Sequence, residues 1–522
     1  MGSSTEVSAP DMPTTESDSV TNEKHITNEK HITNEKHITN EKHITKETAG
    51  DVQIESAGWD ESATRRLIRK IDVTLIPFLA LLYLLSFLDR TNIGNARLDS
   101  LEEDLNIEGG LQFNDALAIF FPFYVAAEIP SNMAMKRWRP SIWIPSIMVA
   151  WAVCTTLMGI VTNYAGLMAC RSALGIAEGG LFPGITYYIT MWYRRHECGL
   201  RMAIFFSAAT AAGAFGGLLA RGIMEMRGTA GLSGWQWIFI LEGILTFVVA
   251  LIAYVVMQDY PATAKFLTPE EREEIQARLK RDRSSLADEF DVRYFWDALK
   301  DWKIWVHMFI TIGVYTGLYS YSLFLPTIIN SLGTATSPEM AQLLTVPPYV
   351  VACVFCVGAG WYADKIGQRG IFMIGFMVMA IVGLIMLIAT ENSAARYIGC
   401  FLLASGIYPN VPQGVAWNGN NIGGSLKRGV GIAMHVGFGN LGGAIAAYLF
   451  PSWHGPRFIP GFATLLACQA MALVLSVIMY IYLRRENARR DREYKPPSEY
   501  TEEEKAAERE KGDNATFFRY TI

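Results

Sequence analysis

The chain has 522 residues, of which 51% are hydrophobic and 18% are charged, and its formal net charge is -5. Residues 1–70, 258–301 and 484–522 hold 61 of the 95 charged side chains, whereas the other 369 residues hold only 34. Soluble globular proteins average about 25% charged residues and nucleic-acid binders usually present a basic surface, so this pattern excludes an ordinary soluble enzyme and a disordered scaffold and argues against a nucleic-acid partner.

The N-terminal part of the chain, residues 1–64, is predicted to be a disordered tail. Within it, residues 21–45 repeat Thr-Asn-Glu-Lys-His-Ile four times, so four of the eight histidines fall in one tract. Such a tract could bind a metal ion. Because each repeat offers a single isoleucine to bury, we favour a polar disordered tail and predict no metal site.

Twelve mostly apolar stretches follow, six on each side of a polar linker at residues 258–302. A helix needs about 20 apolar residues to cross a bilayer, and lipid offers no hydrogen-bond partners to backbone groups outside a helix. The predicted spans are residues 72–96, 114–135, 141–161, 164–190, 201–224, 235–257, 303–329, 341–363, 370–389, 395–415, 429–451 and 460–483. The sequence therefore predicts an all-α membrane protein with twelve transmembrane helices in two six-helix halves, residues 65–257 and 303–484.

Basic residues gather at alternate ends of the predicted spans. Six segments are rich in lysine and arginine: those before span 1 and after span 12, and the loops between spans 2 and 3, 4 and 5, 8 and 9, and 10 and 11. The loop between spans 1 and 2 is acidic instead. Because basic loops stay in the cytoplasm, both termini and the linker are predicted to be cytoplasmic.

The linker and the C-terminal tail at residues 485–522 both show helix signals. In the linker, Thr268 is a potential N-cap, Pro269 suits the first helical position and Glu271 completes a capping box. These residues predict a helix that reaches about Leu279. The tail is acidic and is predicted to be partly helical.

One loop resembles a transporter motif. Residues 360–369 read Gly-Trp-Tyr-Ala-Asp-Lys-Ile-Gly-Gln-Arg and resemble the loop between spans 8 and 9 of the major facilitator superfamily. The loop combines a tight glycine turn, a carboxylate at Asp364 and a basic group at Arg369. The resemblance implies that these two residues, and Asn421 ahead of the next basic loop, act in a cytoplasmic gate.

The first half carries a more specific resemblance. Its motifs are Leu-Asp-Arg-Thr-Asn-Ile-Gly-Asn-Ala at 88–96, Glu-Ile-Pro-Ser-Asn at 128–132, Arg-x-x-Leu-Gly-x-x-Glu-Gly-x-x-Phe-Pro-Gly at 171–184, Trp-Tyr-Arg-Arg-His-Glu at 192–197 and Trp-Ile-Phe-Ile-Leu-Glu-Gly at 237–243. Together they resemble the anion:cation symporter family, in its fungal branch of allantoate-, nicotinate- and pantothenate-type permeases. The resemblance covers about residues 58–485 and implies the major facilitator fold, with spans 1 and 4 lining a central cavity.

Six charged residues fall at membrane depth, where an unpaired charge is costly and therefore suggests a function. They are Asp89, Arg90, Glu128, Arg171, Glu178 and Glu242. Arg171 and Glu178 are seven residues apart, close to two helical turns, so they share one face of span 4. Asp89 and Arg90 are turned by about 100° from each other on span 1. If both spans line the cavity, as the resemblance implies, these four charges would face one another across a water-filled cleft.

The resemblance also implies a division of roles among the four. Glu178 is the expected main proton carrier and Asp89 a coupled second site, because a partly desolvated carboxyl group can load and release a proton near neutral pH. Arg90 is expected to face the anionic substrate, since a guanidinium holds a carboxylate with two hydrogen bonds. Arg171 is expected at the substrate site too, where it would pair with a carboxylate and release it as the protein changes state. The alternative is a permanent ion-pair network that holds the helices together.

The remaining candidates are assigned from their local surroundings. Glu128 and Glu242 could each cap a helix or bond freed backbone groups near a helix break, and we favour a structural or gating role for both. Tyr315 and Tyr319 lie four residues apart on span 7 and share a face. They could stack on or hydrogen-bond an organic acid, and helix packing is the alternative. Asn410 in span 10 is a further candidate substrate contact.

The sequence thus predicts a secondary transporter and not an enzyme, since it shows no metal cluster, nucleophile motif or nucleotide loop. The expected activity is proton-coupled uptake of a small organic anion, such as a nicotinate-, allantoate- or pantothenate-type carboxylate, by alternating access. No cofactor is expected beyond the proton gradient. The expected partners are the substrate, protons and the lipid bilayer, for a monomer in the plasma membrane. Export of an acidic metabolite is the alternative, and a non-transporting sensor is disfavoured by the short, low-complexity tails.

Overall fold

A computed structural model of the protein describes residues 59–107, 110–194, 197–283, 292–333 and 337–522. These residues form α-helices and short 3-10 helices, and no strand occurs among them. The prediction of an all-α protein is therefore confirmed for the described part of the chain. The chain separates into two units, Met1–Thr64 and Arg65–Ile522. The predicted disordered tail, with its histidine repeat, falls almost wholly outside the described residues.

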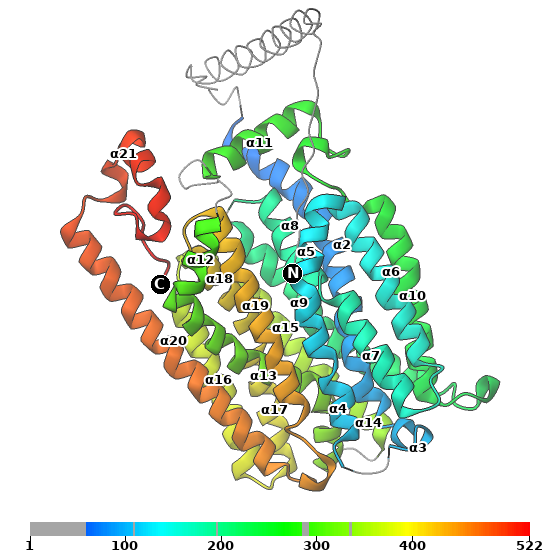
Figure 1. Ribbon diagram of the computed structural model, residues 1–522. Helices are drawn as coiled ribbons and strands as arrows, with labels where there is room; N and C mark the ends of the chain where they lie inside the picture. Colours follow the sequence, from blue (N-terminus) through cyan, green and yellow to red (C-terminus); the bar gives the residue numbers. More distant parts are fainter. Residues whose placement is uncertain (1–58, 108–109, 195–196, 284–291, 334–336) are drawn as a thin grey trace, which may run out of the picture. The chain divides into compact units, whose positions relative to one another are not determined.

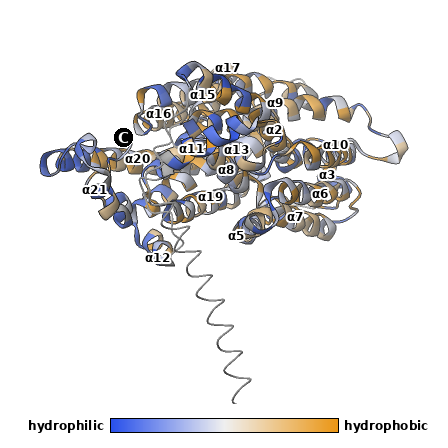
Figure 2. Cartoon of the chain, turned by 90° about the horizontal axis from the view of Figure 1, so that it is seen from above, coloured by the Kyte–Doolittle hydropathy of each residue, from blue (hydrophilic) through white to orange (hydrophobic). Residues whose placement is uncertain are grey.

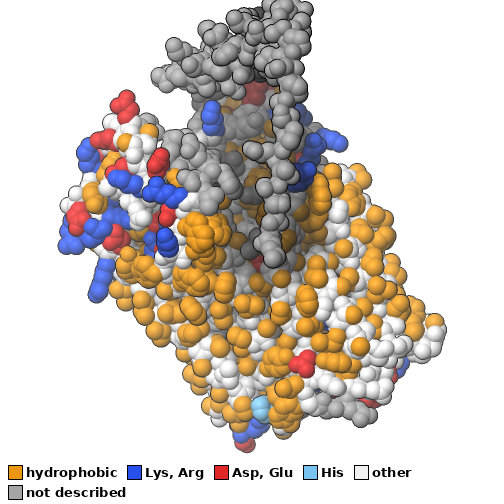
Figure 3. Space-filling model, in the orientation of Figure 1, with side chains coloured by type: hydrophobic (Ala, Val, Ile, Leu, Met, Phe, Trp, Pro, Cys, Tyr) orange, Lys and Arg blue, Asp and Glu red, His pale blue; other side chains and the backbone are white. Residues whose placement is uncertain are grey.

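Nine of the described helices are long and apolar enough to cross a membrane, and each matches one predicted span. They are α2 (Glu61–Ala96), α6 (Pro140–Met158), α9 (Cys198–Met224), α10 (Gly234–Val256), α13 (Trp302–Ser331), α15 (Val346–Ile366), α16 (Gly370–Ala389), α19 (Ser425–Ala447) and α20 (Ile459–Glu493). Figure 1 shows many of these helices running along one another. Their outward side chains include many exposed apolar residues (Figure 3). Because lipid rather than water suits such a surface, the fold indicates a multi-pass membrane protein.

Three further predicted spans are each divided between two shorter helices. The pairs are α4 (Gln112–Ala118) with α5 (Phe120–Trp138), α7 (Tyr164–Glu178) with α8 (Leu181–Trp192), and α17 (Ser393–Ile407) with α18 (Asn410–Asn420). α17 ends just before Pro409, which lacks the N–H that a continuing helix requires. α7 ends at Glu178, and Gly179 and Gly180 separate it from α8. Breaks in membrane-spanning helices often border binding sites, so the break after α7 draws attention to the surroundings of Glu178.

Helices from before and after the linker meet at a central interface. Before the linker, in the first helix group (α2 to α10), α6 packs against α7 and α10. After it, in the second helix group (α13 to α20), α13 packs against α19 and α20. Between the groups, α9 packs against α15 and α18, and α5 packs against α19. In Figure 2, seen from above, α6, α7 and α10 lie on one side and α16 and α20 on the other.

Glycines let the two helix groups approach closely at this interface. A Cβ atom at Gly94 of α2 would collide with the backbone oxygen of Leu323 in α13. A Cβ atom at Gly443 of α19 would collide with the ring of Phe121 in α5. Small residues at such contacts allow backbones of membrane helices to pack tightly. The polar side chains beside these contacts are therefore held within reach of one another.

The linker helix starts as predicted. The Thr268 N–H donates to Glu271 Oε2 at 2.8 Å, and the Glu271 N–H donates to Thr268 Oγ1 at 3.2 Å, so the capping box is confirmed. The helix, α11 (Pro269–Arg283), runs past Leu279. The remaining described short helices are α3 (Leu101–Asp104), α12 (Val292–Lys300), α14 (Pro338–Leu343), α21 (Glu502–Ala507), η2 (Thr229–Gly231), η3 (Pro261–Thr263), η4 (Ser452–His454), η5 (Pro497–Glu499) and η6 (Arg509–Asn514). The last of these confirm a partly helical C-terminal tail.

Candidate functional site

The central interface holds a buried ion pair between α2 and the end of α7. Arg90 Nη2 donates to Glu178 Oε1 at 2.6 Å, and Arg90 Nε donates to the same oxygen at 3.2 Å. Ser86, one helical turn before Arg90, also donates to Glu178 Oε1. Arg90 is 2% exposed and Glu178 is fully buried. The structure thus brings together two of the four charges that the sequence placed on spans 1 and 4.

Arg90 also reaches the second helix group. Its Nη1 donates to the Tyr319 hydroxyl oxygen on α13 at 2.8 Å. The Tyr319 hydroxyl in turn donates to Asn440 Oδ1 on α19 at 2.5 Å. One guanidinium is therefore bonded to both sides of the interface. We call the connected residues the central polar cluster: Ser86, Arg90, Glu178, Tyr319 and Asn440.

Aromatic rings surround the guanidinium. The Arg90 Cζ atom lies 4.8 Å from the ring centre of Tyr124 and 5.1 Å from that of Phe120, both on α5. It lies 5.8 Å from the ring centre of Tyr319. A cation over aromatic faces is stabilised by their electron density, and a guanidinium keeps its charge at any physiological pH. These ring contacts therefore stabilise Arg90 as a buried cation.

The two carboxyl oxygens of Glu178 are in different situations. Oε1 accepts all the hydrogen bonds described above, whereas Oε2 is buried without a hydrogen-bond partner among the described residues. A buried acceptor that lacks a donor costs free energy. A proton on Oε2 would neutralise the carboxylate and weaken its hold on Arg90. The Arg90–Glu178 pair therefore leaves one carboxyl oxygen available for a further interaction.

Arg171 lies close to the cluster but makes a different set of contacts from the one expected. Its Nε donates to the backbone oxygen of Ala116 at 3.1 Å, and its Nη1 is 3.5 Å from the backbone oxygen of Arg90. Its Cζ atom lies 5.2 Å from the ring centre of Phe120. The expected carboxylate partner is not found among the described side chains. Arg171 instead ties α7 to α4 and α2.

Asp89 faces away from the central polar cluster. Its Oδ2 accepts hydrogen bonds from Trp151 Nε1 on α6 at 3.1 Å and from Thr246 Oγ1 on α10 at 3.0 Å. Two carboxyl groups lie close enough to interact with Asp89 electrostatically: Glu242 on α10 and Glu178 of the central polar cluster. The structure therefore does not gather the four charges in one cleft. The turn of about 100° between successive helix residues sends Arg90 to the interface and Asp89 into the first helix group.

The expected backbone bonds of Glu128 and Glu242 are not present among the described residues. All four of their carboxyl oxygens are buried without a hydrogen-bond partner there. The physical reason is that α5 and α10 both continue as helices through these positions. Few backbone groups are freed in a continuous helix, so the carboxyl groups find nothing to bond locally.

Of the other predicted substrate contacts, Tyr315 joins the site and Asn410 does not. The ring of Tyr315 packs edge-on against Tyr319 with 6.2 Å between ring centres. Asn410 Nδ2 donates to the backbone oxygen of Gly406 at 2.7 Å. The Asn410 amide therefore bridges the break between α17 and α18 and makes no bond to the cluster.

The predicted gate loop contacts the first helix group. Asp364 Oδ2 accepts a hydrogen bond from the backbone N–H of Leu200, at the start of α9, at 2.6 Å. Asp364 also pairs with Arg369, and Arg369 Nη1 donates to Gln413 Oε1 at 3.1 Å. A Cβ atom at Gly199 would collide with Arg369. The loop thus closes the interface at the end that is predicted to be cytoplasmic.

The opposite end of the interface is also bridged. Arg97 Nη2 donates to Ser452 Oγ at 2.6 Å, and the Tyr448 hydroxyl donates to Asp115 Oδ1 at 2.7 Å. Both bonds join the first helix group to the segment between α19 and α20. With polar contacts at both ends and buried side chains at the centre, the central polar cluster is enclosed.

Comparison with known proteins assigns the chain to a family. A family model described as the Major Facilitator Superfamily matches residues 79–447. The chain belongs to the major facilitator superfamily. An uncharacterized transporter of Schizosaccharomyces pombe is 32% identical over 85% of this chain and 89% of that relative. The MFS-type transporter efuF of Hormonema carpetanum is 33% identical over 85% of this chain and 90% of that relative.

A solved structure supports the fold independently. A crystal structure of a D-xylose–proton symporter matches with a TM-score of 0.57 at 16% identity, covering 78% of this chain and 97% of that protein. At this identity the likeness shows the fold alone. The family and the transporter names of the relatives agree with the prediction of a membrane transporter rather than an enzyme.

In this facilitator protein, residues 512–522 lie against the second helix group, and we call them the C-terminal strap. The Asp513 carboxylate accepts hydrogen bonds from Lys303 Nζ and Lys427 Nζ, each at 2.6 Å. Burial alone would raise the pKa of Asp513, but the two ammonium groups outweigh burial, so the pKa of this carboxyl group lies below its ordinary value. Arg490 of α20 donates to the backbone oxygen of Asp513 at 3.0 Å.

The far end of the strap reaches the gate loop. Asn421 pairs with the backbone of Thr521 in both directions, at 2.7 and 3.0 Å. The backbone N–H of Arg369 donates to the backbone oxygen of Ile522 at 2.8 Å. Asn421, which the family resemblance assigned to the inner gate, therefore holds the strap. The strap in turn fixes the loop that carries Asp364.

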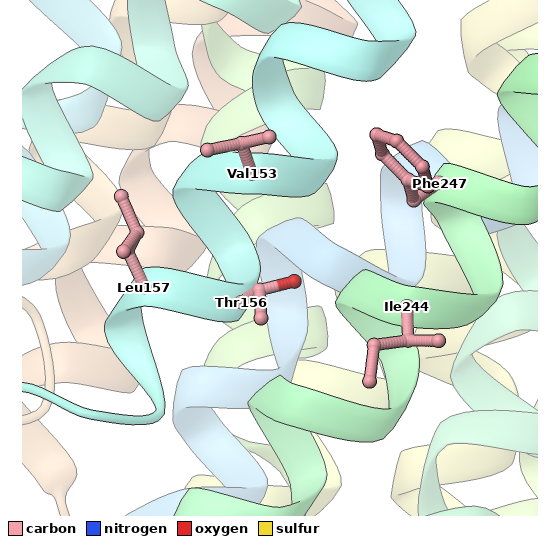
Figure 4. Close-up of a pocket in the computed structure, with 5 residues that line it drawn as sticks. All are labelled: Val153, Thr156, Leu157, Ile244 and Phe247. Atoms are coloured by element: carbon pink, nitrogen blue, oxygen red, sulfur yellow. The ribbon is translucent and has the colours of Figure 1, made fainter.

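The hollow drawn in Figure 4 lies apart from these contacts, between α6 and α10. Val153, Thr156 and Leu157 of α6 and Ile244 and Phe247 of α10 line its volume of about 270 Å³. No member of the central polar cluster contributes to its lining. Its apolar side chains are partly exposed on the outer surface, the kind of surface that lipid covers. The hollow is therefore a feature of the outer wall, and the buried cluster is the candidate functional site.

Sequence reasoning missed two members of the cluster, for different reasons. Ser86 lies four residues before Arg90, and this spacing places two side chains on one helix face. That signal was present in the sequence. Asn440 bonds Tyr319, which is 121 residues away along the chain, and no local pattern links them. A single amide in the glycine-rich helix α19 was the available hint.

Proposed function

We propose that the protein is a proton-coupled symporter that takes up a small organic anion by alternating access. The observation that carries the proposal is the buried Arg90–Glu178 pair, in which Glu178 keeps one oxygen without a partner among the described residues. Arg90 is also bonded to Tyr319 of the second helix group. A cation at the interface of the two groups can therefore respond both to a proton and to an anion.

The proposed cycle exchanges one partner of Arg90 for another. A proton binds Glu178 Oε2, and the neutral carboxyl group loosens its bonds to Arg90 Nη2 and Nε. These two parallel donors then hold the carboxylate of the substrate, while Tyr319 keeps its bond to Nη1. Opening then alternates between the Asp364–Leu200 contact and the contacts at the opposite end of the interface. One proton and one anion enter together, and the buried charge stays balanced.

Several finer assignments belong to the same proposal. The motifs of the first helix group resemble the fungal branch of the anion:cation symporter family, and the relatives described above come from fungi. A nicotinate-, allantoate- or pantothenate-type carboxylate is the proposed substrate. The proposed setting is a monomer in the plasma membrane with both termini and the linker in the cytoplasm, because the basic loops fall on that side.

Transport in lipid vesicles tests the proposal. Purified protein is reconstituted, and accumulation of radiolabelled nicotinate, allantoate and pantothenate is measured with an acid-outside gradient and at equal pH. We expect the gradient to drive accumulation of at least one probe, and Glu178→Gln to abolish that response while exchange of internal for external substrate survives. Unchanged gradient-driven accumulation in Glu178→Gln would refute the proton role. If no probe accumulates and cells expressing the protein release an endogenous acid faster, the chain is an exporter of an acidic metabolite instead.

A further inference from the structure

Glu128 is a buried carboxyl group for which the cycle above has no use. It lies on α5, is 1% exposed, and has no hydrogen-bond partner for either oxygen among the described residues. It also has no ion-pair partner there. Burying a carboxyl group without donors is expensive. A residue in this state is either a local cost or a place where another molecule supplies the donors.

The surroundings of Glu128 place it beside the central polar cluster. It follows Tyr124 by one helical turn, and Tyr124 contacts the Arg90 guanidinium. Its carboxyl group lies close enough to the hydroxyl groups of Tyr124, Tyr315 and Tyr319 to interact with them electrostatically. Glu128 and Arg90 therefore border on the same tyrosines, although they belong to different helices.

Glu128 also faces across the central interface. A Cβ atom built at Gly437 of α19 would lie 3.3 Å from Glu128 Oε2. The carboxyl group thus points at a glycine of the second helix group, where no side chain occupies the space. A molecule held between the two groups when they separate would meet Arg90 and Glu128 together.

We propose that Glu128 is a specificity-determining residue that accepts hydrogen bonds from an N–H group of the substrate. This proposal rests on the proposed function, because it assumes that the substrate carboxylate binds Arg90. The substrate class is then narrower than organic anions in general. It comprises organic acids that also carry an amide, ureido or ammonium N–H group, and acids that lack a donor are disfavoured because they leave Glu128 unpaired.

Glu242 provides a matched control. Like Glu128 it is buried, and neither of its oxygens has a partner among the described residues. Unlike Glu128, it lies inside the first helix group beside Asp89. Replacing it with leucine reproduces the chemical change and the change of shape, but on a helix that contributes no member of the central polar cluster.

The test measures binding to the purified full-length protein by ligand-induced thermal stabilisation. The probes are allantoate and pantothenate, which carry N–H donors, and nicotinate and benzoate, which at neutral pH do not. For the wild type we expect tighter binding of at least one donor-bearing acid than of both donor-free acids. Glu128→Leu should weaken donor-bearing acids by about 10-fold or more, the scale of a lost hydrogen bond to a charged group, and leave donor-free acids within about twofold.

Two further variants keep the proposal open to refutation. Glu128→Gln retains one acceptor oxygen and the side-chain shape, so it should fall between the wild type and Glu128→Leu, and it serves if the leucine variant does not fold. Glu242→Leu should leave the ratio between the two probe classes unchanged. Equal weakening of all probes by Glu128→Leu and Glu128→Gln, or no preference of the wild type for a donor-bearing acid, would overturn the proposal.

The outcome is separable from that of the proposed function. If every variant keeps its proton coupling, the proton cycle is refuted. If the probe selectivity still depends on Glu128 in that case, the present assignment is supported. A changed number of protons carried per anion in Glu128→Gln, without a change in selectivity, would overturn it and make Glu128 a second proton carrier.

Discussion

Two buried charge networks in this protein are built on opposite principles. In the central polar cluster, Glu178 bonds through one oxygen and leaves the other without a partner among the described residues. In the C-terminal strap, each Asp513 oxygen accepts a hydrogen bond from a different lysine, Lys303 or Lys427. The first network lies between the two helix groups, whereas the second joins elements on one side of that interface.

The difference shows that one fold can hold both a network whose bonds can be exchanged, the central polar cluster, and a network of lasting bonds, the C-terminal strap. Burying charges is costly, and a pair repays that cost only when its remaining donors and acceptors are also satisfied. The strap meets this condition, so its bonds are expected to persist through transport. The central polar cluster does not meet this condition, because Glu178 Oε2 has no partner among the described residues. Under the proposed cycle, a proton or an anion can therefore replace one partner of the Arg90–Glu178 pair. Under the proposed cycle, the unsatisfied acceptor at the interface between the helix groups takes part in transport, whereas the satisfied acceptors of the strap hold the structure together.

The largest expected effect comes from removing the cation of the cluster. Arg90→Ala leaves Glu178 as an uncompensated buried charge, which should lower the free energy of unfolding by about 3–5 kcal/mol and abolish substrate binding. Thermal unfolding and vesicle uptake measure the two effects. Adding Glu178→Gln to Arg90→Ala should restore most of the stability and none of the transport. A single variant as stable as the wild type would show that Glu178 is already neutral in the enclosed state.

The next largest effect concerns the C-terminal strap. Asp513→Asn removes the charge between Lys303 and Lys427, and each lysine keeps a contact with Asp301. A loss of about 1–3 kcal/mol is expected for a group left with weaker partners, localised to the strap. Hydrogen exchange of residues 512–522 should accelerate while the exchange of α2 stays unchanged. Slow exchange of the strap in the variant would show that the backbone contacts of Arg490 and Asn421 suffice.

The same carboxyl group sets a pH dependence. The pKa of Asp513 lies below its ordinary value in the folded protein, so its contribution is fully present above the unfolded value of about 3.9. It is lost as the pH falls through the lowered folded value. The strap should therefore remain protected from exchange in mildly acidic solution and become accessible only in strong acid. Release of the strap near neutral pH would contradict this assignment.

Most of the helices, and the proximity of Arg90 to Glu178, could be predicted from the sequence, whereas the ion pair between these two residues was not predicted. Apolar length alone placed nine spans, because lipid imposes it on every membrane helix. The spacing of Arg171 and Glu178 placed both on one face of α7, yet packing gave them different partners. Asp89 was expected at the cavity, but Trp151 and Thr246, which come from other helices, bind it. A face of a helix can be predicted from spacing, whereas the neighbour of that face depends on tertiary packing.

The strap shows a different limit. Its acidic composition predicted a polar tail and gave no sign of docking. The lysines that bind Asp513 lie 210 and 86 residues away along the chain, and no local period connects them. The helix break after Glu178 was also missed, because the apolar stretch at 164–190 continues through it. Such features depend on contacts between distant segments, and composition does not encode them.

A smaller effect, on substrate binding, distinguishes a hydroxyl group of the central polar cluster from one that only packs between helices. Tyr319→Phe removes the hydroxyl group that joins Arg90 to Asn440, and we expect substrate to bind roughly tenfold more weakly, the scale of one hydrogen bond to a charged group. The free energy of unfolding should fall by about 1–3 kcal/mol, because the buried Arg90 Nη1 and Asn440 Oδ1 each lose a hydrogen-bond partner. Tyr321→Phe is the matched control on the same helix, since its hydroxyl group donates to the backbone oxygen of Cys400 within the second helix group. Equal losses of binding in both variants would remove Tyr319 from the site.

The smallest effect is expected for an ion pair that belongs to neither network. Arg457 Nη1 lies 2.9 Å from Glu391 Oε1, and the two side chains are 40% and 82% exposed. Water screens such a pair, so Arg457→Ala should change the free energy of unfolding by less than about 1 kcal/mol and leave uptake unaltered. Thermal unfolding alongside Arg90→Ala provides the comparison. Similar destabilisation by both variants would mean that burial does not determine how much an ion pair contributes to the free energy of unfolding. That result would contradict the contrast between the central polar cluster, the C-terminal strap and the surface pairs.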